Sequence, residues 1–262
     1  MYQEKLIVIN GIETNYKIAG KGDDVLILHG WGGSSDSWIA IQGSLVKKGY
    51  RVIVPDLPGF GKSKTPSAVW GVDDYAKWVN EFLIRLYGKK ENKFFLIGHS
   101  FGGRLSVRYA VNNPERLKKL ILVASAGIKP RPEIKTIMIS WTARFGNALF
   151  TPRIFRRFRD SARNLFYVLL RHKDYVKAEG TMKQVIVKVI NEDLSGDLVK
   201  IDTKTLLIWG DLDKLVPVKY GRLFKEKIQD SELIVLHKIG HSPHIEVPEE
   251  LASIITNFLQ LQ

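Results

Sequence analysis

Residues 94–105 read Phe-Phe-Leu-Ile-Gly-His-Ser-Phe-Gly-Gly-Arg-Leu, in which an apolar run leads into a serine between two glycines. The apolar run favours a buried strand, and the residues after Ser100 favour a helix. Side chains at Gly98 and Gly102 would collide across a sharp strand-to-helix turn, so glycine is required there. Such a turn exposes the serine hydroxyl, and the stretch predicts a nucleophile elbow. The plain structural alternative is a glycine-rich junction with a bystander serine.

Strand and helix patterns alternate on both sides of this stretch. Asn10-Gly11 favours a tight hairpin turn between two N-terminal strands, because both residues accept positive φ. The other predicted strands are 25–28, 51–55, 94–97, 117–124, 205–209 and 233–236, and the predicted helices include 37–46, 72–87, 220–228 and 248–259. This alternation predicts an α/β fold whose mostly parallel central sheet is covered by helices on both faces.

Length and composition are those of a single catalytic domain. The chain has 262 residues, of which 45% are hydrophobic, enough to bury a substantial core. It has no cysteine, so neither disulfides nor cysteine-ligated metal sites are available. The first ten residues do not form a signal-peptide pattern, and no apolar run approaches the roughly 18 residues of a membrane span. We therefore expect a cytoplasmic protein.

The alternation breaks between residues 128 and 200. This segment is helical, aromatic and basic in pattern, and it contains no convincing strand. We interpret it as a helical cap inserted into a core made of residues 1–127 and 201–262.

A serine nucleophile needs a base to take its proton and an acid to orient that base. Loops after two later predicted strands offer both types of residue. Asp211 and Asp213 follow the strand 205–209, and His241 and His244 follow the strand 233–236. The order serine, aspartate, histidine is that of α/β hydrolases.

Five motifs together make the chain resemble α/β-hydrolase-fold serine hydrolases over nearly its whole length. They are His-Gly-Trp-Gly at 29–32, Asp-Leu-Pro-Gly-Phe-Gly-Lys-Ser at 56–63, Gly-His-Ser-Phe-Gly-Gly at 98–103, Gly-Asp-Leu-Asp at 210–213 with Pro217 behind it, and Gly-His at 240–241 before Glu246 and Pro248. The chain is also similar to the pimeloyl-acyl-carrier-protein methyl ester esterase type, which shares the His-Gly-Trp-Gly loop and a short helical cap.

The resemblance implies a role for particular residues. It makes Ser100 the nucleophile, Asp213 rather than Asp211 the acid, and His241 rather than His244 the base. The backbone N–H groups of Trp31 and Phe101 would form the oxyanion hole. We expect a substrate pocket lined by Trp31, Phe101, Trp141 and His244. The chemistry requires no cofactor.

The remaining histidines do not suggest a second kind of site. His29 precedes the oxyanion loop and is expected to brace it, and His99 is expected to pack beside or orient the elbow. His172 and His237 belong to no motif. The six histidines lack a ligand spacing that favours a metal site.

Positive charge is concentrated in the predicted cap. Residues 128–200 contain 15 Lys and Arg against 7 Asp and Glu, in a chain of net charge +13. Residues 151–166 pattern as an amphipathic helix in which arginines, including Arg156 and Arg159, flank an aromatic and aliphatic stripe. An apolar face over the site with a solvated basic face is the simplest interpretation. A sharper one is contact with an acidic carrier protein, as in the resembling esterases.

The leading functional prediction is hydrolysis of carboxylic esters with small to medium acyl groups. Serine at position 100 disfavours dehalogenase and epoxide-hydrolase chemistry, which use a carboxylate nucleophile. Carbon-carbon bond hydrolases of ring-cleavage products are the alternative enzyme class, although many carry asparagine at the position of His99. A non-catalytic hydrolase-like binding protein is the alternative outside enzymes. No recognisable nucleic-acid module supports nucleic-acid binding.

Overall fold

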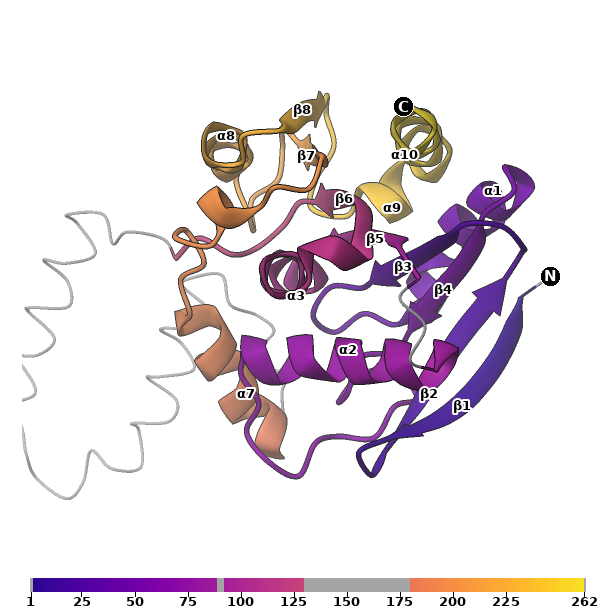
Figure 1. The fold of residues 1–262 in the computed structure, drawn as a ribbon. Coiled ribbons are helices and arrows are strands. Elements are labelled where there is room, and N and C mark those ends of the chain that lie inside the picture. The colour runs from indigo at the N-terminus through magenta and orange to yellow at the C-terminus, as the bar shows by residue number, and fades with distance from the viewer. Residues whose placement is uncertain (1, 89–91, 130–179, 262) are drawn as a thin grey trace, which may run out of the picture.

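The computed structural model describes residues 2–88, 92–129 and 180–261, and in these residues helices cover both faces of an eight-stranded sheet (Figure 1). This architecture confirms the predicted α/β fold. Trp141, His172 and the predicted arginine-rich helix at 151–166 lie outside the described residues. Within the described residues, every helix is too short or too polar to span a lipid bilayer.

The sheet is mostly parallel, with an antiparallel hairpin at one edge. Its strand order is β1-β2-β4-β3-β5-β6-β7-β8, and only the β1–β2 and β2–β4 pairs are antiparallel. The strands are β1 (Gln3–Ile9), β2 (Ile12–Ala19), β3 (Asp24–Leu28), β4 (Arg51–Pro55), β5 (Phe94–His99), β6 (Leu117–Val123), β7 (Thr205–Gly210) and β8 (Ser231–Leu236). Asn10 and Gly11 have φ of 49° and 82°, which confirms the predicted hairpin turn.

The parallel register brings the carboxyl ends of β3, β5, β6, β7 and β8 to one edge of the sheet. Leu28 pairs with Gly98, His99 with Val123, and Gly210 with Leu236. The loops that follow β3, β5, β7 and β8 contain Trp31, Ser100, Asp213 and His241, respectively. Ligand sites of open α/β sheets lie at this edge.

Each face of the sheet has its own hydrophobic cluster, because neighbouring residues of a strand point to opposite faces. On β7, Leu206 and Ile208 belong to one cluster, and Leu207 and Trp209 to the other. Helices α1 (Ile39–Lys47) and α10 (Pro248–Gln260) cover the first face, whereas α2 (Val72–Tyr87), α3 (Phe101–Asn112) and α8 (Val218–Lys227) cover the second (Figure 1).

The described end of the predicted cap packs onto this second cluster. Helix α7 (Gly180–Asn191) contributes Met182, Val185 and Val189 to it and lies beside α2 (Figure 1). At the end of α7, the buried Arg104 of α3 donates a hydrogen bond to the carbonyl of Glu192. Burial lowers the pKa of Arg104 to about 10. The exit from the predicted cap is thereby tied to the helix that follows Ser100.

Candidate active site

Ser100 lies on a strained turn between β5 and α3. Its φ of 51° and ψ of −109° are unusual for a residue with a side chain, and such a conformation costs on the order of 1–3 kcal/mol. Backbone hydrogen bonds hold it in place. The Ser100 N–H donates to the Val123 carbonyl, and the Ser100 carbonyl accepts from the N–H groups of Arg104 and Ala126. The turn therefore depends on the neighbouring strand β6 as well as on its own sequence.

Gly102 allows the elbow to approach the neighbouring strand β3. A Cβ at Gly102 would lie 2.1 Å from the Leu28 carbonyl oxygen and 2.6 Å from that of His29. Both are backbone atoms, which cannot move without moving the loop that carries Trp31. Glycine at position 102 therefore allows the elbow to lie close to this loop.

Ser100 and His241 are in direct hydrogen-bond contact. The Ser100 Oγ lies 2.9 Å from the His241 Nε2, although the two residues are 141 positions apart in the chain. The His241 side chain is largely buried, with 17% of its surface exposed. At this distance the imidazole can accept the hydroxyl proton.

Asp213 binds the other nitrogen of the same ring. Its Oδ2 lies 2.7 Å from the His241 Nδ1, and its Oδ1 accepts hydrogen bonds from the N–H groups of Leu215 and Val216. The Asp213 side chain is fully buried. Because a carboxylate only accepts, the Nδ1 carries the proton and the Nε2 presents its lone pair to Ser100.

Asp211 belongs to a separate, exposed pair. Its Oδ2 lies 2.8 Å from the His237 Nδ1, and its Oδ1 accepts from the Lys238 N–H. The His237 side chain is 80% exposed. Asp211 therefore joins the two loops at the surface and does not contact His241.

The loop carrying His241 is held by a short helix that the sequence does not signal clearly. Helix α9 (Pro243–Glu246) directs the Glu246 carboxylate back to the N–H groups of Gly240 and Ser242. The peptide groups on both sides of His241 are thus fixed by one side chain. Glu246 is part of the final sequence motif, and this contact gives that residue a structural role.

His29 braces the loop after β3. Its Nε2 accepts from the Leu57 N–H at 2.9 Å, so its Nδ1 carries the proton and donates to the Gly30 carbonyl at 2.8 Å. The ring is fully buried, and burial lowers its pKa. A neutral His29 thereby links the β3 loop to the loop after β4.

Asp56, from the motif at 56–63, supports the same two loops. Its carboxylate accepts hydrogen bonds from the N–H groups of Ser35 and Lys62 and from the Asn15 side chain. Burial raises its pKa, but these hydrogen bonds more than offset the effect and the pKa is lowered. The motif therefore anchors the surroundings of the site.

Trp31 and Phe101 lie against each other beside Ser100. Their ring centroids are 5.3 Å apart, and the Phe60 ring packs edge-on against Trp31 at 4.8 Å. Phe101 is the first residue of α3, and N–H groups in the first turn of a helix have no partner within it. The arrangement thus provides an aromatic wall and a free backbone donor next to Ser100.

The His244 side chain is enclosed by neighbouring residues of the described part of the chain. It is 5% exposed and stacks flat on Trp38, with ring centroids 4.5 Å apart and an interplanar angle of 5°. The ring also lies 4.5 Å from that of His99. A side chain enclosed in this way packs behind His241, and its contribution to a substrate pocket stays a prediction. No pattern in the sequence signals this stack, because Trp38 lies in a separate short 3-10 helix (Ser35–Trp38).

We expect the free energy of unfolding to decrease as the pH falls from about 6.5 to about 4. Burial lowers the pKa values of His29, His99 and His244, the last to about 4. In this window the unfolded chain binds a proton at His244 that the folded chain excludes, so this residue makes stability rise with pH by about 1.4 kcal/mol per pH unit, and His29 and His99 act in the same direction.

Urea unfolding at pH 7 and pH 5 measures this dependence. His244→Phe preserves a ring to stack on Trp38 but removes one titrating group, so the variant should lose less stability between the two pH values. Equal losses in the native protein and the variant would contradict the assignment.

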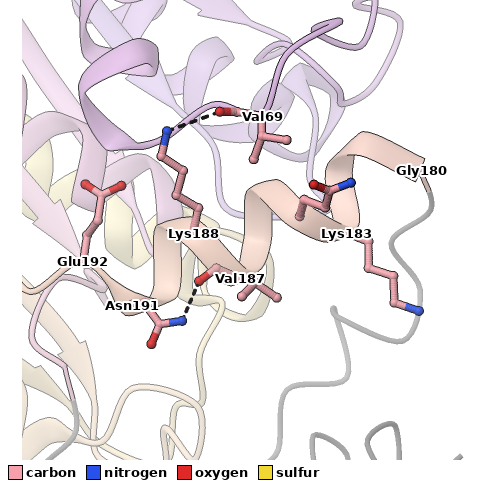
Figure 2. A pocket seen from close by; sticks show the side chains of 8 residues that line it. Val69, Gly180, Lys183, Val187, Lys188, Asn191 and Glu192 are labelled. Carbon is pink, nitrogen blue, oxygen red and sulfur yellow. Dashed lines mark hydrogen bonds between the residues drawn. The ribbon is translucent and has the colours of Figure 1, made fainter. Parts of the chain in front are cut away.

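One hollow among the described residues is separate from Ser100, Asp213 and His241. It has a volume of about 660 Å³ and lies along α7 and the nearby Val69, lined also by Lys183, Val187, Lys188 and Asn191 (Figure 2). It includes none of Ser100, Asp213 and His241. Among the described residues, no group of three or more His, Asp or Glu side chains is placed to bind a metal ion.

A mostly parallel sheet that presents a serine, a histidine and an aspartate in hydrogen-bond contact at its carboxyl edge defines the class of α/β hydrolases. The family model described as alpha/beta hydrolase fold matches residues 24–185. The chain belongs to this family, which confirms the resemblance inferred from the five motifs.

Individual relatives differ in the reactions their names describe. A pimeloyl-[acyl-carrier protein] methyl ester esterase from Aeromonas hydrophila is 31% identical over 92% of this chain and 96% of its own length. A 2-hydroxy-6-oxo-6-(2'-aminophenyl)hexa-2,4-dienoic acid hydrolase from Metapseudomonas resinovorans is 28% identical over 98% of this chain and 91% of its own. The crystal structure of a serine hydrolase involved in carbazole degradation covers both chains completely, with a TM-score of 0.75 and 26% identity.

Proposed function

We propose that the protein is a serine hydrolase that cleaves carboxylic esters of small to medium acyl groups through an acyl-enzyme. The observation that carries this proposal is the chain of hydrogen bonds from Ser100 through His241 to the buried Asp213. This arrangement makes a hydroxyl nucleophilic at neutral pH without a cofactor.

In the first half of the reaction, the Ser100 Oγ attacks the ester carbonyl carbon while the His241 Nε2 takes its proton. The tetrahedral intermediate then collapses, and His241 returns the proton to the leaving alkoxide to release an alcohol. In the second half, His241 activates a water that attacks the acyl carbonyl, and the acid leaves with Ser100 restored. Asp213 holds the imidazole tautomer and stabilises its cation in both halves.

The negative charge on the tetrahedral oxygen requires preorganised donors. We assign this role to the backbone N–H groups of Phe101 and Trp31. The position of Phe101 at the start of α3 supports the first, because the N-terminus of a helix favours negative charge. The contact between the Trp31 loop and the elbow supports the second. Removing one such donor costs about 100- to 1,000-fold in rate.

Relatives support two kinds of bond cleavage. The Aeromonas hydrophila relative is named as a methyl ester esterase, which favours ester hydrolysis. The Metapseudomonas resinovorans relative is named as a hydrolase of a ring-cleavage dienoic acid, and it makes carbon-carbon bond hydrolysis the second candidate. We assign Ser100 and His241 the same roles, as nucleophile and base, toward either candidate substrate.

Turnover of a substrate panel discriminates between these functions. We expect the protein to hydrolyse p-nitrophenyl acetate, butyrate and octanoate, with kcat/KM varying along the series, and to turn over 2-hydroxy-6-oxo-6-phenylhexa-2,4-dienoate more slowly. Faster turnover of the dienoate would favour the second candidate. Absence of turnover on every member would favour a hydrolase-like binding protein.

We also propose that the ester substrate is attached to an acidic carrier protein. The arginine-rich residues 151–166 that suggest it lie outside the described residues. The name of the Aeromonas hydrophila relative, which includes a carrier protein, supports it. In the same panel, a methyl ester linked to an acyl-carrier protein should then be hydrolysed faster than the free methyl ester.

A further inference from the structure

We propose that His99 is a positioning residue that fixes the backbone of His241 relative to Ser100. This inference rests on the proposed function, since it assigns a role toward the same base and nucleophile. His99 is the last residue of β5 and precedes Ser100 directly. Its Nε2 lies 2.8 Å from the His241 carbonyl oxygen.

Two adjacent residues therefore hold the same histidine from two sides. Ser100 binds the ring of His241 through the Nε2, and His99 binds the peptide group of His241 through its carbonyl. Since residues 99 and 100 are covalently joined, the two contacts form a closed ring of bonds. A movement of the base loop away from the elbow has to break both.

The protonation state of His99 follows from its partner. A carbonyl oxygen only accepts, so the His99 Nε2 carries the proton and the Nδ1 has a lone pair. This Nδ1 is buried and has no hydrogen-bond partner among the described residues. Burial, with smaller contributions from His244 and His241, lowers the pKa of His99 well below its usual value. His99 thus stays neutral and acts as a single fixed donor.

The His99 ring also packs closely against the loop that carries Trp31. A Cβ at Gly30 would lie 2.7 Å from the His99 Nδ1 and 3.3 Å from the Ser100 Cβ. Only glycine leaves room for the ring at this point. The His99 ring therefore lies between the β3 loop and the base loop, and it relates both of them to the nucleophile.

Three variants of His99 distinguish the effect of its hydrogen bond from the effect of its side-chain packing. In glutamine the amide nitrogen is as many bonds from the Cβ as the histidine Nε2, whereas in asparagine it corresponds to the Nδ1. His99→Gln can therefore donate to the His241 carbonyl, while His99→Asn places its donor toward Gly30 and His99→Leu has none. The glutamine and asparagine variants carry the same amide group and differ by one methylene, which changes the reach of the donor.

We expect His99→Leu and His99→Asn to lower kcat on a p-nitrophenyl ester by on the order of 100-fold, as a misplaced catalytic group does, with KM nearly unchanged. His99→Gln should recover most of this loss. The low-field proton resonance of the bond between the His241 Nδ1 and Asp213 should weaken in the leucine and asparagine variants and persist in the glutamine variant. This resonance reports the position of the base without any turnover.

Equal kcat in the glutamine and asparagine variants would overturn the proposal, because it would show that packing alone matters. A low-field resonance unchanged in His99→Leu would overturn it as well. If His99→Leu does not fold, the other two variants still decide. Failure of the proposed function has a different signature: the native protein then hydrolyses no ester, or Ser100→Ala keeps its turnover.

Discussion

Ser100→Ala is expected to lower kcat for ester hydrolysis by about a millionfold, as loss of the nucleophile does in serine hydrolases that act through a triad. Alanine leaves His241 and Asp213 in place but removes the oxygen that attacks the carbonyl. The free energy of unfolding should not decrease, because φ and ψ at residue 100 are set by backbone hydrogen bonds. Steady-state kinetics on p-nitrophenyl butyrate, with urea unfolding in parallel, measures both effects.

Ser106→Ala is the matched control for this substitution. Ser106 is a buried serine on the same helix α3, and its Oγ donates to the Gly102 carbonyl and not to His241. It should keep nearly native turnover. Turnover of Ser100→Ala comparable to that of Ser106→Ala would exclude Ser100 as the nucleophile.

Asp213→Asn is expected to lower kcat by about 10,000-fold. An asparagine amide can donate to the His241 Nδ1, which favours the tautomer with the proton on the Nε2, where it blocks acceptance from Ser100. The imidazole cation also loses its buried counter-charge. The loss should appear in kcat, with KM little affected.

Asp211→Asn provides a closely matched comparison, because Asp211 also binds a histidine but at the surface. We expect it to change kcat far less than Asp213→Asn does. Steady-state kinetics of the two single variants at one pH measures this difference in kcat. If Asp211→Asn lowered kcat more than Asp213→Asn, the assignment of Asp213 as the acid that orients His241 would be wrong.

The fold and the arrangement of the site were accessible from sequence because they depend on local patterns. The central strands β3, β5 and β7 each contain a continuous apolar run, and the elbow, the hairpin turn and the helix at Pro248 have turn and cap residues of their own. The positions of Asp213 and His241 directly after β7 and β8 then place them at one edge, because the register of a parallel sheet aligns the carboxyl ends of its strands.

Other contacts between residues far apart in the chain could not be predicted from the sequence. The hydrogen bond from His99 to the His241 carbonyl joins residues 142 positions apart and involves a backbone acceptor, which no residue type signals. The stack of His244 on Trp38 depends on how α9 lies against the short helix at Ser35–Trp38. Such contacts follow from tertiary packing, and this is why the enclosure of His244 by neighbouring rings was not predicted from the sequence.

The preference for one substrate depends on the residues that surround the acyl group rather than on the triad. Trp31, Phe101 and Phe60 form the described aromatic wall beside Ser100. Trp141, the other expected pocket residue, lies outside the described residues. Relatives with the same fold and different named substrates are consistent with this division between a shared reaction centre and a variable pocket.

The most direct measurement is the site of covalent modification by a serine-reactive fluorophosphonate. Intact mass and peptide mapping should show one adduct per chain, on Ser100, and the adduct should form far more slowly in His241→Ala, which lacks the base. An adduct on another residue, or ester turnover that continues at its native rate in the fully modified protein, would contradict the assignment of Ser100 as the nucleophile.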